Sequence, residues 1–161
     1  MTAARRRTLA AMEYRIVNPA GWIARAEPLM RANWAETGFD FDFAPDVGAY
    51  QRMHDAGLVF AIAALDGEDL IGYCTVVVAP HPHNQRVVVA GNDALFVVPE
   101  RRGGPVALRI IQAAEAEAAR RGAVRFAWHT RAGTPLALVL QRRGYRPADV
   151  VVVKEISRGH Y

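Results

Sequence analysis

The chain of 161 residues, 52% hydrophobic and 22% charged, is about one globular domain long and large enough to bury a core. No apolar run approaches the roughly 20 residues that a membrane-spanning helix needs, so no membrane partner is predicted. The single cysteine, Cys74, excludes an intramolecular disulfide and a cysteine-based zinc site, and we expect a reducing, cytoplasmic environment. The net charge of +4 favours anionic ligands without choosing among them.

The first eleven residues differ in character from the rest of the chain. Residues 1–11 contain three consecutive arginines beside a short apolar stretch that lacks the length of a signal peptide. We expect a loose basic tail here, with Met12 as an alternative start. No repeat, low-complexity tract or long linker follows, so residues 12–161 are predicted to form a single domain.

Helical patterns dominate the N-terminal third. A short strand is predicted at 13–17, and the pair Asn18-Pro19 is typical of a helix start. Apolar residues then recur at spacings of three and four up to Gly38, which predicts an amphipathic helix. Residues 39–43 alternate with a strand's period, but they stand between two helical patterns and are interpreted as a loop or short lid. A second helix is predicted at 45–56.

The middle of the chain predicts most of a sheet. Residues 58–65 and 70–79 are apolar and rich in branched side chains, and the short acidic turn between them is typical of a hairpin. A third strand is predicted at 86–98. Gly91-Asn92-Asp93 interrupts it, where either a bulge or a functional break fits.

A basic, glycine-rich turn opens the last part of the chain. Residues 100–104 lead into a helical stripe that begins at Val106. A strand at 124–130, a short helix at 135–142 and a last strand at 150–156 follow. The predicted class is α+β, with a mixed sheet flanked by helices.

This turn is a candidate anion site. A glycine-rich turn before a helix offers unpaired backbone N–H groups and the positive end of the helix dipole. Arg101 and Arg102 add positive charge. The residues match neither the phosphate loop of nucleoside triphosphatases nor the dinucleotide-binding pattern. A plain turn with solvated arginines stays open as the alternative.

The segment Leu95 to Ala107, LFVVPERRGGPVA, resembles motif A of the GNAT family of N-acetyltransferases. In that family a strand ending in V-x-P-E-x-R-G leads into Q/R-x-x-G-x-G/A and a long helix. Arg102 takes the first position of the core pattern and Ala107 the last. Pro105 stands at the middle glycine and removes one N–H donor, which predicts weakened rather than abolished binding.

The resemblance extends over most of the chain. The order of predicted elements agrees with the family, and segments 80–83, 92–97 and 128–130 resemble the subgroup of phage-related acetyltransferases. The resemblance implies a GNAT-like, mostly antiparallel sheet flanked by helices, with a splayed central strand pair.

The resemblance also implies acetyl-coenzyme A as the co-substrate. Its pyrophosphate is expected on the turn and the helix start, and its pantetheine arm along the motif strand as an added β-strand. The backbone N–H of Val97 or Val98 is expected to polarise the thioester carbonyl. The residues expected to hold the cofactor are Phe96, Val97, Val98, Arg101, Arg102, Gly103, Gly104, Val106 and Ala107.

Acyl transfer to an amine needs a base for the amine's proton and an acid for the leaving thiolate. Asp93 occupies the position where many family members carry a glutamate base, and we expect it to act as base or substrate anchor. A structural role at the break in its strand is the alternative. His129 ends the strand across the splay and is expected to take part in proton transfer. Leu140 stands where the family often places a tyrosine acid, so no residue is predicted for that role.

The acceptor amine is not identified by the sequence. His81 and His83, on either side of Pro82, and Glu36 near the lid are expected to line the acceptor side. No metal site is predicted, because the two histidines have no evident third ligand. Cys74 lies in an apolar strand and is expected to be a buried hydrophobe rather than a nucleophile. A homodimer would be in keeping with proteins of this kind.

The leading hypothesis is therefore an N-acetyltransferase that works by direct attack of an amine on the thioester. A non-catalytic acyl-CoA-binding or regulatory module of the same fold is the alternative, suggested by Pro105 and Leu140. A nucleic-acid-binding domain, suggested by the isoelectric point near 9.7, is disfavoured because the arginines are spread without exposed aromatics or a recognition motif.

Overall fold

The computed structural model describes residues 12–131, 133–154 and 156. The chain divides into two compact units, Met1–His129 and Thr130–Tyr161, which we describe separately. The basic tail predicted at 1–11 lies outside the described residues. One domain over 12–161 stays a prediction. Within the described part, no helix has the length and apolar character needed to cross a membrane.

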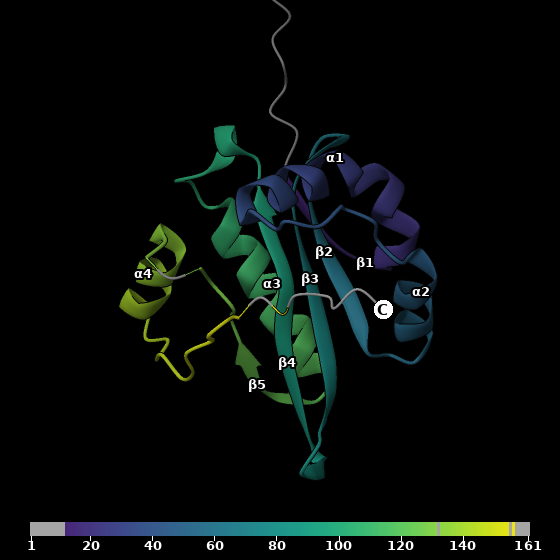
Figure 1. Ribbon diagram of the computed structural model, residues 1–161, viewed down its shortest axis with the longest axis vertical. Helices are drawn as coiled ribbons and strands as arrows, with labels where there is room; N and C mark the ends of the chain where they lie inside the picture. The colour runs from purple at the N-terminus through teal and green to yellow at the C-terminus, as the bar shows by residue number, and fades with distance from the viewer. Residues whose placement is uncertain (1–11, 132, 155, 157–161) are drawn as a thin grey trace, which may run out of the picture. The chain divides into compact units, whose positions relative to one another are not determined.

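The first unit is built on a five-stranded sheet with the order β1-β2-β3-β4-β5 (Figure 1). Neighbouring strands are antiparallel except for the parallel pair β4 and β5. The strands are β1 (Met12–Val17), β2 (Val59–Asp66), β3 (Asp69–His81), β4 (Asn84–Val97) and β5 (Ala123–Ala127).

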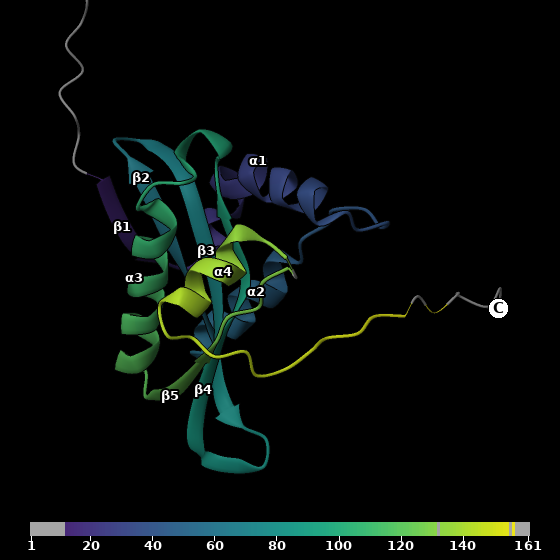
Figure 2. The same cartoon turned by 90° about the vertical axis from the view of Figure 1, so that its left-hand side faces the viewer.

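Helices cover both faces of this sheet. They are α1 (Pro19–Thr37), α2 (Val47–Asp55) and α3 (Val106–Arg120), with a 3-10 helix η1 (Pro99–Arg101) after β4. Figure 2 shows α3 on one face and α1 and α2 on the other. The predicted mixed, mostly antiparallel sheet flanked by helices is confirmed.

Local signals set the ends of α1. The Asn18 side chain accepts from the backbone N–H of Ala20 at 3.0 Å and caps the first turn. At the other end Gly38 adopts a φ of 73°, and its N–H donates to the Trp34 carbonyl. The predicted helix is therefore confirmed together with both of its boundary residues.

The aromatic stretch after α1 forms a loop, as predicted. The rings of Phe39, Phe41 and Phe43 gather around Trp34 at centroid distances of 4.4, 5.2 and 5.7 Å. The indole N–H of Trp34 also donates to the Phe41 carbonyl at 3.0 Å. These contacts hold the loop against the last turns of α1.

The main core lies between the sheet and α3. Phe60, Ile62, Cys74 and Ile110 are fully buried there. Burial, with a smaller contribution from the charge of Asp93, raises the pKa of the Cys74 thiol. Cys74 is a buried hydrophobe, as expected.

A buried carboxylate stabilises the C-terminal end of α3. Glu117, 3% exposed, accepts from the guanidinium groups of Arg120 and Arg121 at 2.7 Å. Hydrogen bonds from Arg120 and then Arg121 hold the pKa of Glu117 below its ordinary value, against the opposing effect of burial.

Replacing Glu117 with glutamine is expected to lower the free energy of unfolding at pH 7 by about 1–3 kcal/mol, because charge-assisted hydrogen bonds are lost. The folded-state pKa is depressed, so the stabilisation is present above the ordinary value of 4.5 and is lost as the pH falls through the folded value. Urea denaturation at pH 7 and pH 3.5 measures both effects. The matched control is Glu27→Gln, in the exposed pair with Arg31; an equal loss in the two variants would contradict the buried network.

The second unit contains one helix among its described residues, α4 (Pro135–Arg142). Its predicted bounds are confirmed. The last predicted strand, 150–156, is wrong: residues 150–154 and 156 form no strand, and the four valines are 76% to 89% exposed. A run of β-branched residues has the propensity for a strand, but a strand forms only where a neighbour pairs with its backbone. The strand predicted at 124–130 likewise ends early, at Ala127.

Candidate active site

The parallel strands β4 and β5 separate halfway along β4. Their pairing runs from Val88 opposite Ala123 to Gly91 opposite Ala127 and stops there. Strand β4 continues to Val97, paired only with β3 in the part of the chain that the structure describes. A register shift opposite Thr75 and Val76 marks a bulge at this point of β4. The predicted splayed strand pair is confirmed, and the far half of β4 has an open edge.

The side chain of Asn92 bridges the two strands where the ladder ends. Its Oδ1 accepts from the backbone N–H of His129 at 2.7 Å, and its Nδ2 donates to the His129 carbonyl at 3.2 Å. The Asn92 side chain thus makes the two hydrogen bonds that the backbone of a paired strand would make with His129. Because a side chain makes them, the two backbones lie farther apart than in a strand pair. Since Asn92 is 6% exposed, this bridge is a buried spacer at the start of the splay.

The side chain of His129 also contacts Asn92. Its Nδ1 lies 3.2 Å from the Asn92 carbonyl oxygen. A carbonyl oxygen only accepts, so this contact places a proton on Nδ1 and makes Nε2 the acceptor in the neutral ring. The structure therefore places His129 against Asn92, the residue before Asp93.

Asp93 is exposed on the face of the sheet that α1 and α2 cover. Its Oδ2 accepts a hydrogen bond from the Tyr50 hydroxyl, on α2, at 3.1 Å. Nearby on β3, the Tyr73 hydroxyl accepts from the Asn33 side chain of α1 at 3.2 Å. The Asp93 side chain is therefore bonded to a tyrosine of another element. Among the hydrogen bonds of the described residues, none joins this side chain to the strand break at Gly91-Asn92.

Both phenols stay protonated at neutral pH. Burial first, and then the charge of Asp93, raises the pKa of Tyr50. Burial is also the largest cause at Tyr73, whose pKa is raised to about 12. Tyr50, Tyr73 and Asn33 could not be predicted as site residues from the sequence, because they come from three separate elements and share no local spacing.

The glycine-rich turn is open, as an anion site requires. Gly103 has a φ of 77°, and a Cβ there would meet nothing within 4 Å. Pro105 precedes α3 and no side chain caps this helix. By helix geometry, the N–H groups of the first turn, from Val106 onward, have no partner within the helix. These residues fit a pyrophosphate, and the missing N–H of Pro105 leaves the neighbouring donors in place.

Arg102 links this turn to two other elements. Its Nε donates to the Val97 carbonyl at 2.8 Å, and its Nη2 donates to Glu36 Oε1 on α1 at 2.7 Å. The guanidinium also lies over the Phe96 ring, 5.1 Å from its centroid. Arg101 is paired with Asp66. An anion that binds to Arg102 must therefore compete with the Glu36 carboxylate.

Replacing Glu36 with glutamine is expected to strengthen acetyl-CoA binding up to about fivefold, because an exposed ion pair of up to about 1 kcal/mol no longer competes. Calorimetric titration at low and high salt measures the change, which should shrink as salt screens the pair. The control is Glu27→Gln on the same helix. Weaker binding by Glu36→Gln would show instead that Glu36 holds Arg102 in its binding position.

Strand alternation decides which backbone groups face the open edge of β4. The Val98 N–H donates to the Ile71 carbonyl of β3 at 3.0 Å and is therefore engaged. Alternation then turns the N–H and carbonyl of Val97 away from β3, and those of Phe96 toward it. Of the two N–H groups expected to polarise the thioester, only that of Val97 faces the splay.

The two histidines that were expected to line the acceptor side lie far from Asp93. His81 and His83 are at the tip of the β3–β4 hairpin, where the His83 N–H donates to His81 Nδ1 at 3.2 Å. Ten residues of strand separate His83 from Asp93, roughly 30 Å at the rise of a β-strand. The structure does not bring the two histidines to Asp93. Among the described residues, no three side chains of the metal-binding types lie together.

Comparison with known proteins identifies the class. Residues 25–145 match the profile of the Acetyltransferase (GNAT) family. The chain therefore belongs to the GNAT family of acetyltransferases, which confirms the family expected from the motif strand and turn. No curated protein sequence matches the chain significantly.

Solved structures share the fold. The aminoglycoside acetyltransferase HMB0005 from an uncultured soil metagenomic sample has a TM-score of 0.74 at 16% identity, over 91% of this chain and 99% of that one. The aminoglycoside N-acetyltransferase AAC(6')-Iy in complex with CoA has a TM-score of 0.71 at 18% identity, over 91% and 95%. The ribosomal-protein-alanine N-acetyltransferase of Brucella melitensis biovar Abortus 2308 has a TM-score of 0.67 at 17% identity, over 92% and 100%.

Proposed function

We propose that this enzyme transfers the acetyl group of acetyl-CoA to a primary amine by direct attack of the amine on the thioester. The observation that carries the proposal is that three features follow one another along β4 and the turn after it. These are Asp93 at the start of the splay, the open edge of β4, and residues 102–107, the glycine-rich turn and helix start that we call the anion turn. An anion site, an unpaired strand edge and a carboxylate are what the pyrophosphate, the pantetheine arm and the amine of this reaction require.

The chain's own groups would hold acetyl-CoA by backbone more than by side chain. The amides of Gly103, Gly104 and the first turn of α3 would bind the pyrophosphate, with Arg102 beside them. The outward N–H of Val97 would pair with the pantetheine arm, while the Val97 carbonyl already accepts from Arg102 Nε at 2.8 Å. Acetyl-CoA supplies an activated acetyl group; the protein supplies position and proton transfer.

Asp93 is the proposed base. Its Oδ2 is fixed by the Tyr50 hydroxyl at 3.1 Å, which leaves Oδ1 to accept the proton of the attacking amine. Tyr50 acts through Asp93 and is a positioning residue. Val97 lies four residues from Asp93, roughly 13 Å at the rise of a β-strand, so its N–H would bind the pantetheine arm rather than the thioester carbonyl.

His129 is the proposed proton donor to the departing thiolate. Because Nδ1 is bonded to the Asn92 carbonyl, the ring can donate outward only from Nε2, in its doubly protonated form. This assignment fills the role that Leu140 leaves vacant.

The test is acetyl-CoA-dependent release of free thiol, measured with a panel of amines: alkylamines, arylalkylamines, spermidine, an aminoglycoside and a peptide with a free N-terminus. Turnover with any of them supports the proposal. Tight binding of acetyl-CoA without turnover of any amine would favour the non-catalytic acyl-CoA-binding module instead. Membership of the phage-related subgroup, a cytoplasmic location and a homodimer stay predictions from the sequence.

A further inference from the structure

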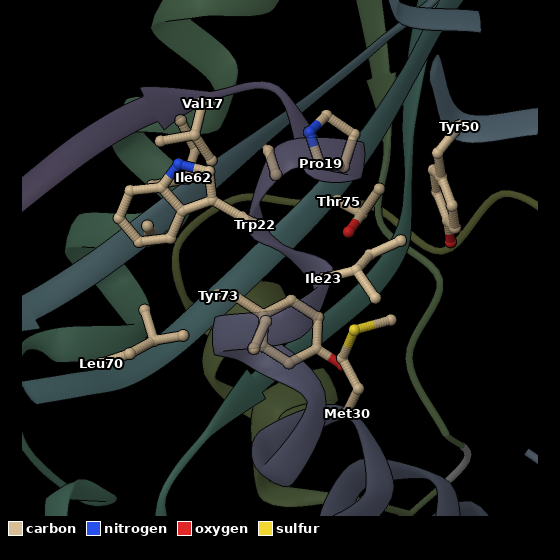
Figure 3. A pocket seen from close by; sticks show the side chains of 13 residues that line it. Val17, Pro19, Trp22, Ile23, Met30, Tyr50, Ile62, Leu70, Tyr73 and Thr75 are labelled. Atoms are coloured by element: carbon tan, nitrogen blue, oxygen red, sulfur yellow. The ribbon is translucent and has the colours of Figure 1, made fainter. Parts of the chain in front are cut away.

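An apolar cleft lies between α1 and the sheet, on the face that carries Asp93 (Figure 3). Trp22, Ile23 and Met30 of α1 form one side, and residues of β2 and β3 form the other. Tyr50 of α2 closes one end. In Figure 3, Trp22 and Leu70 lie at the end opposite Tyr50.

The wall of this cleft has no charge. None of its 13 lining residues is ionised at neutral pH, and its polar side-chain groups are the hydroxyls of Tyr50, Tyr73 and Thr75 and the indole N–H of Trp22. No residue of the anion turn lines it, so the cleft is distinct from the cofactor-binding elements. It therefore suits an apolar group rather than a nucleotide or a sugar.

Tyr50 stands between the cleft and the proposed base. This residue lines the cleft, and its hydroxyl donates to Asp93 at 3.1 Å. An apolar site thus ends beside an exposed carboxylate. A ligand complementary to both has an apolar body and one cationic end.

We propose that the cleft binds the apolar part of the acceptor. The acceptor is then a small primary amine with one alkyl or aryl group in the cleft and its nitrogen at Asp93. The proposal rests on the function proposed above and specifies its substrate. A polyamine or an aminoglycoside would bring further ammonium groups against an uncharged wall, where each desolvated charge is costly. Charge complementarity therefore favours a monoamine.

The test is the dependence of kcat/KM on chain length for n-alkylamines from ethylamine to heptylamine, at saturating acetyl-CoA. Each methylene that enters the cleft should raise kcat/KM by about fourfold, up to a length at which the cleft is full. Spermidine and kanamycin should be poorer than hexylamine by at least about tenfold. The length series uses the unaltered protein and needs no variant to fold.

A pair of variants locates the effect. Ala26, on α1, lines the cleft and is 7% exposed, so Ala26→Leu should occupy part of the space and flatten the length dependence. Ala24→Leu makes the same change on the exposed side of α1 and should leave the length dependence as it is. Thermal melting confirms that both variants fold.

The outcomes separate this proposal from the proposed function. Turnover with a flat length series, or a preference for spermidine or kanamycin, overturns the acceptor assignment and leaves the transferase standing. A flat amine series with a rise from acetyl-CoA to octanoyl-CoA also overturns it and assigns the cleft to the acyl chain. No turnover with any amine overturns the proposed function itself.

Discussion

Replacing Asp93 with asparagine should lower kcat by about 10²- to 10³-fold, the usual contribution of a general base. Asparagine keeps the shape of the side chain, and its Oδ1 can still accept from Tyr50. It cannot take a proton from the amine. The KM for acetyl-CoA should change less than about twofold, because the carboxylate is not among the cofactor-binding groups.

The pH dependence of this variant is diagnostic. An alkylamine titrates near 10.4, so the neutral amine becomes more abundant as the pH rises. The deficit of Asp93→Asn should therefore narrow toward pH 10, measured by thiol release at fixed amine concentration. Asp40→Asn, an exposed carboxylate in the loop after α1, is the control. A deficit below about threefold at pH 7 would assign Asp93 a structural role instead.

Replacing Asn92 with alanine should lower kcat/KM for acetyl-CoA by at least about tenfold and the free energy of unfolding by about 1–3 kcal/mol. The alanine variant loses both side-chain bonds to the His129 backbone and leaves the separation of β4 and β5 without its spacer. Steady-state kinetics and urea denaturation measure the two effects.

Two further variants test this result, one at the same position and one control at another asparagine. Asn92→Asp keeps an acceptor for the His129 N–H and should fall between the wild type and Asn92→Ala. Asn84→Ala, at the exposed hairpin tip, should change neither quantity. If Asn92→Ala lost stability but kept its kcat/KM, the amide would stabilise the fold without shaping the cofactor site.

Local signals explain what could be predicted from the sequence. The strand, turn and helix around Arg102 lie within one short segment, so propensity, glycine placement and helix start all act on neighbouring residues. The caps of α1 at Asn18 and Gly38 are local in the same way. The hairpin of β2 and β3 follows from two apolar runs and one turn.

Contacts between distant segments explain what could not be predicted. The Tyr50–Asp93 bond joins residues 43 positions apart, and no spacing rule links a tyrosine on a short helix to a strand bulge. The pairing of Glu36 with Arg102 spans 66 positions. The predicted strand at 150–156 is wrong for the same reason. Its valines have a high strand propensity, but whether a neighbouring strand is there to pair with them does not depend on the local sequence.

Calorimetric titration of acetyl-CoA into the wild type and Arg102→Glu tests the cofactor site most directly. Arg102 lies on the turn, and the reversed charge would repel the pyrophosphate, so we expect micromolar binding by the wild type and a loss of about 10²-fold in the variant. Arg52→Glu makes the same reversal on α2 and should bind as the wild type does. No binding by the wild type at millimolar acetyl-CoA, or equal binding by Arg102→Glu, would contradict the site proposed at this turn.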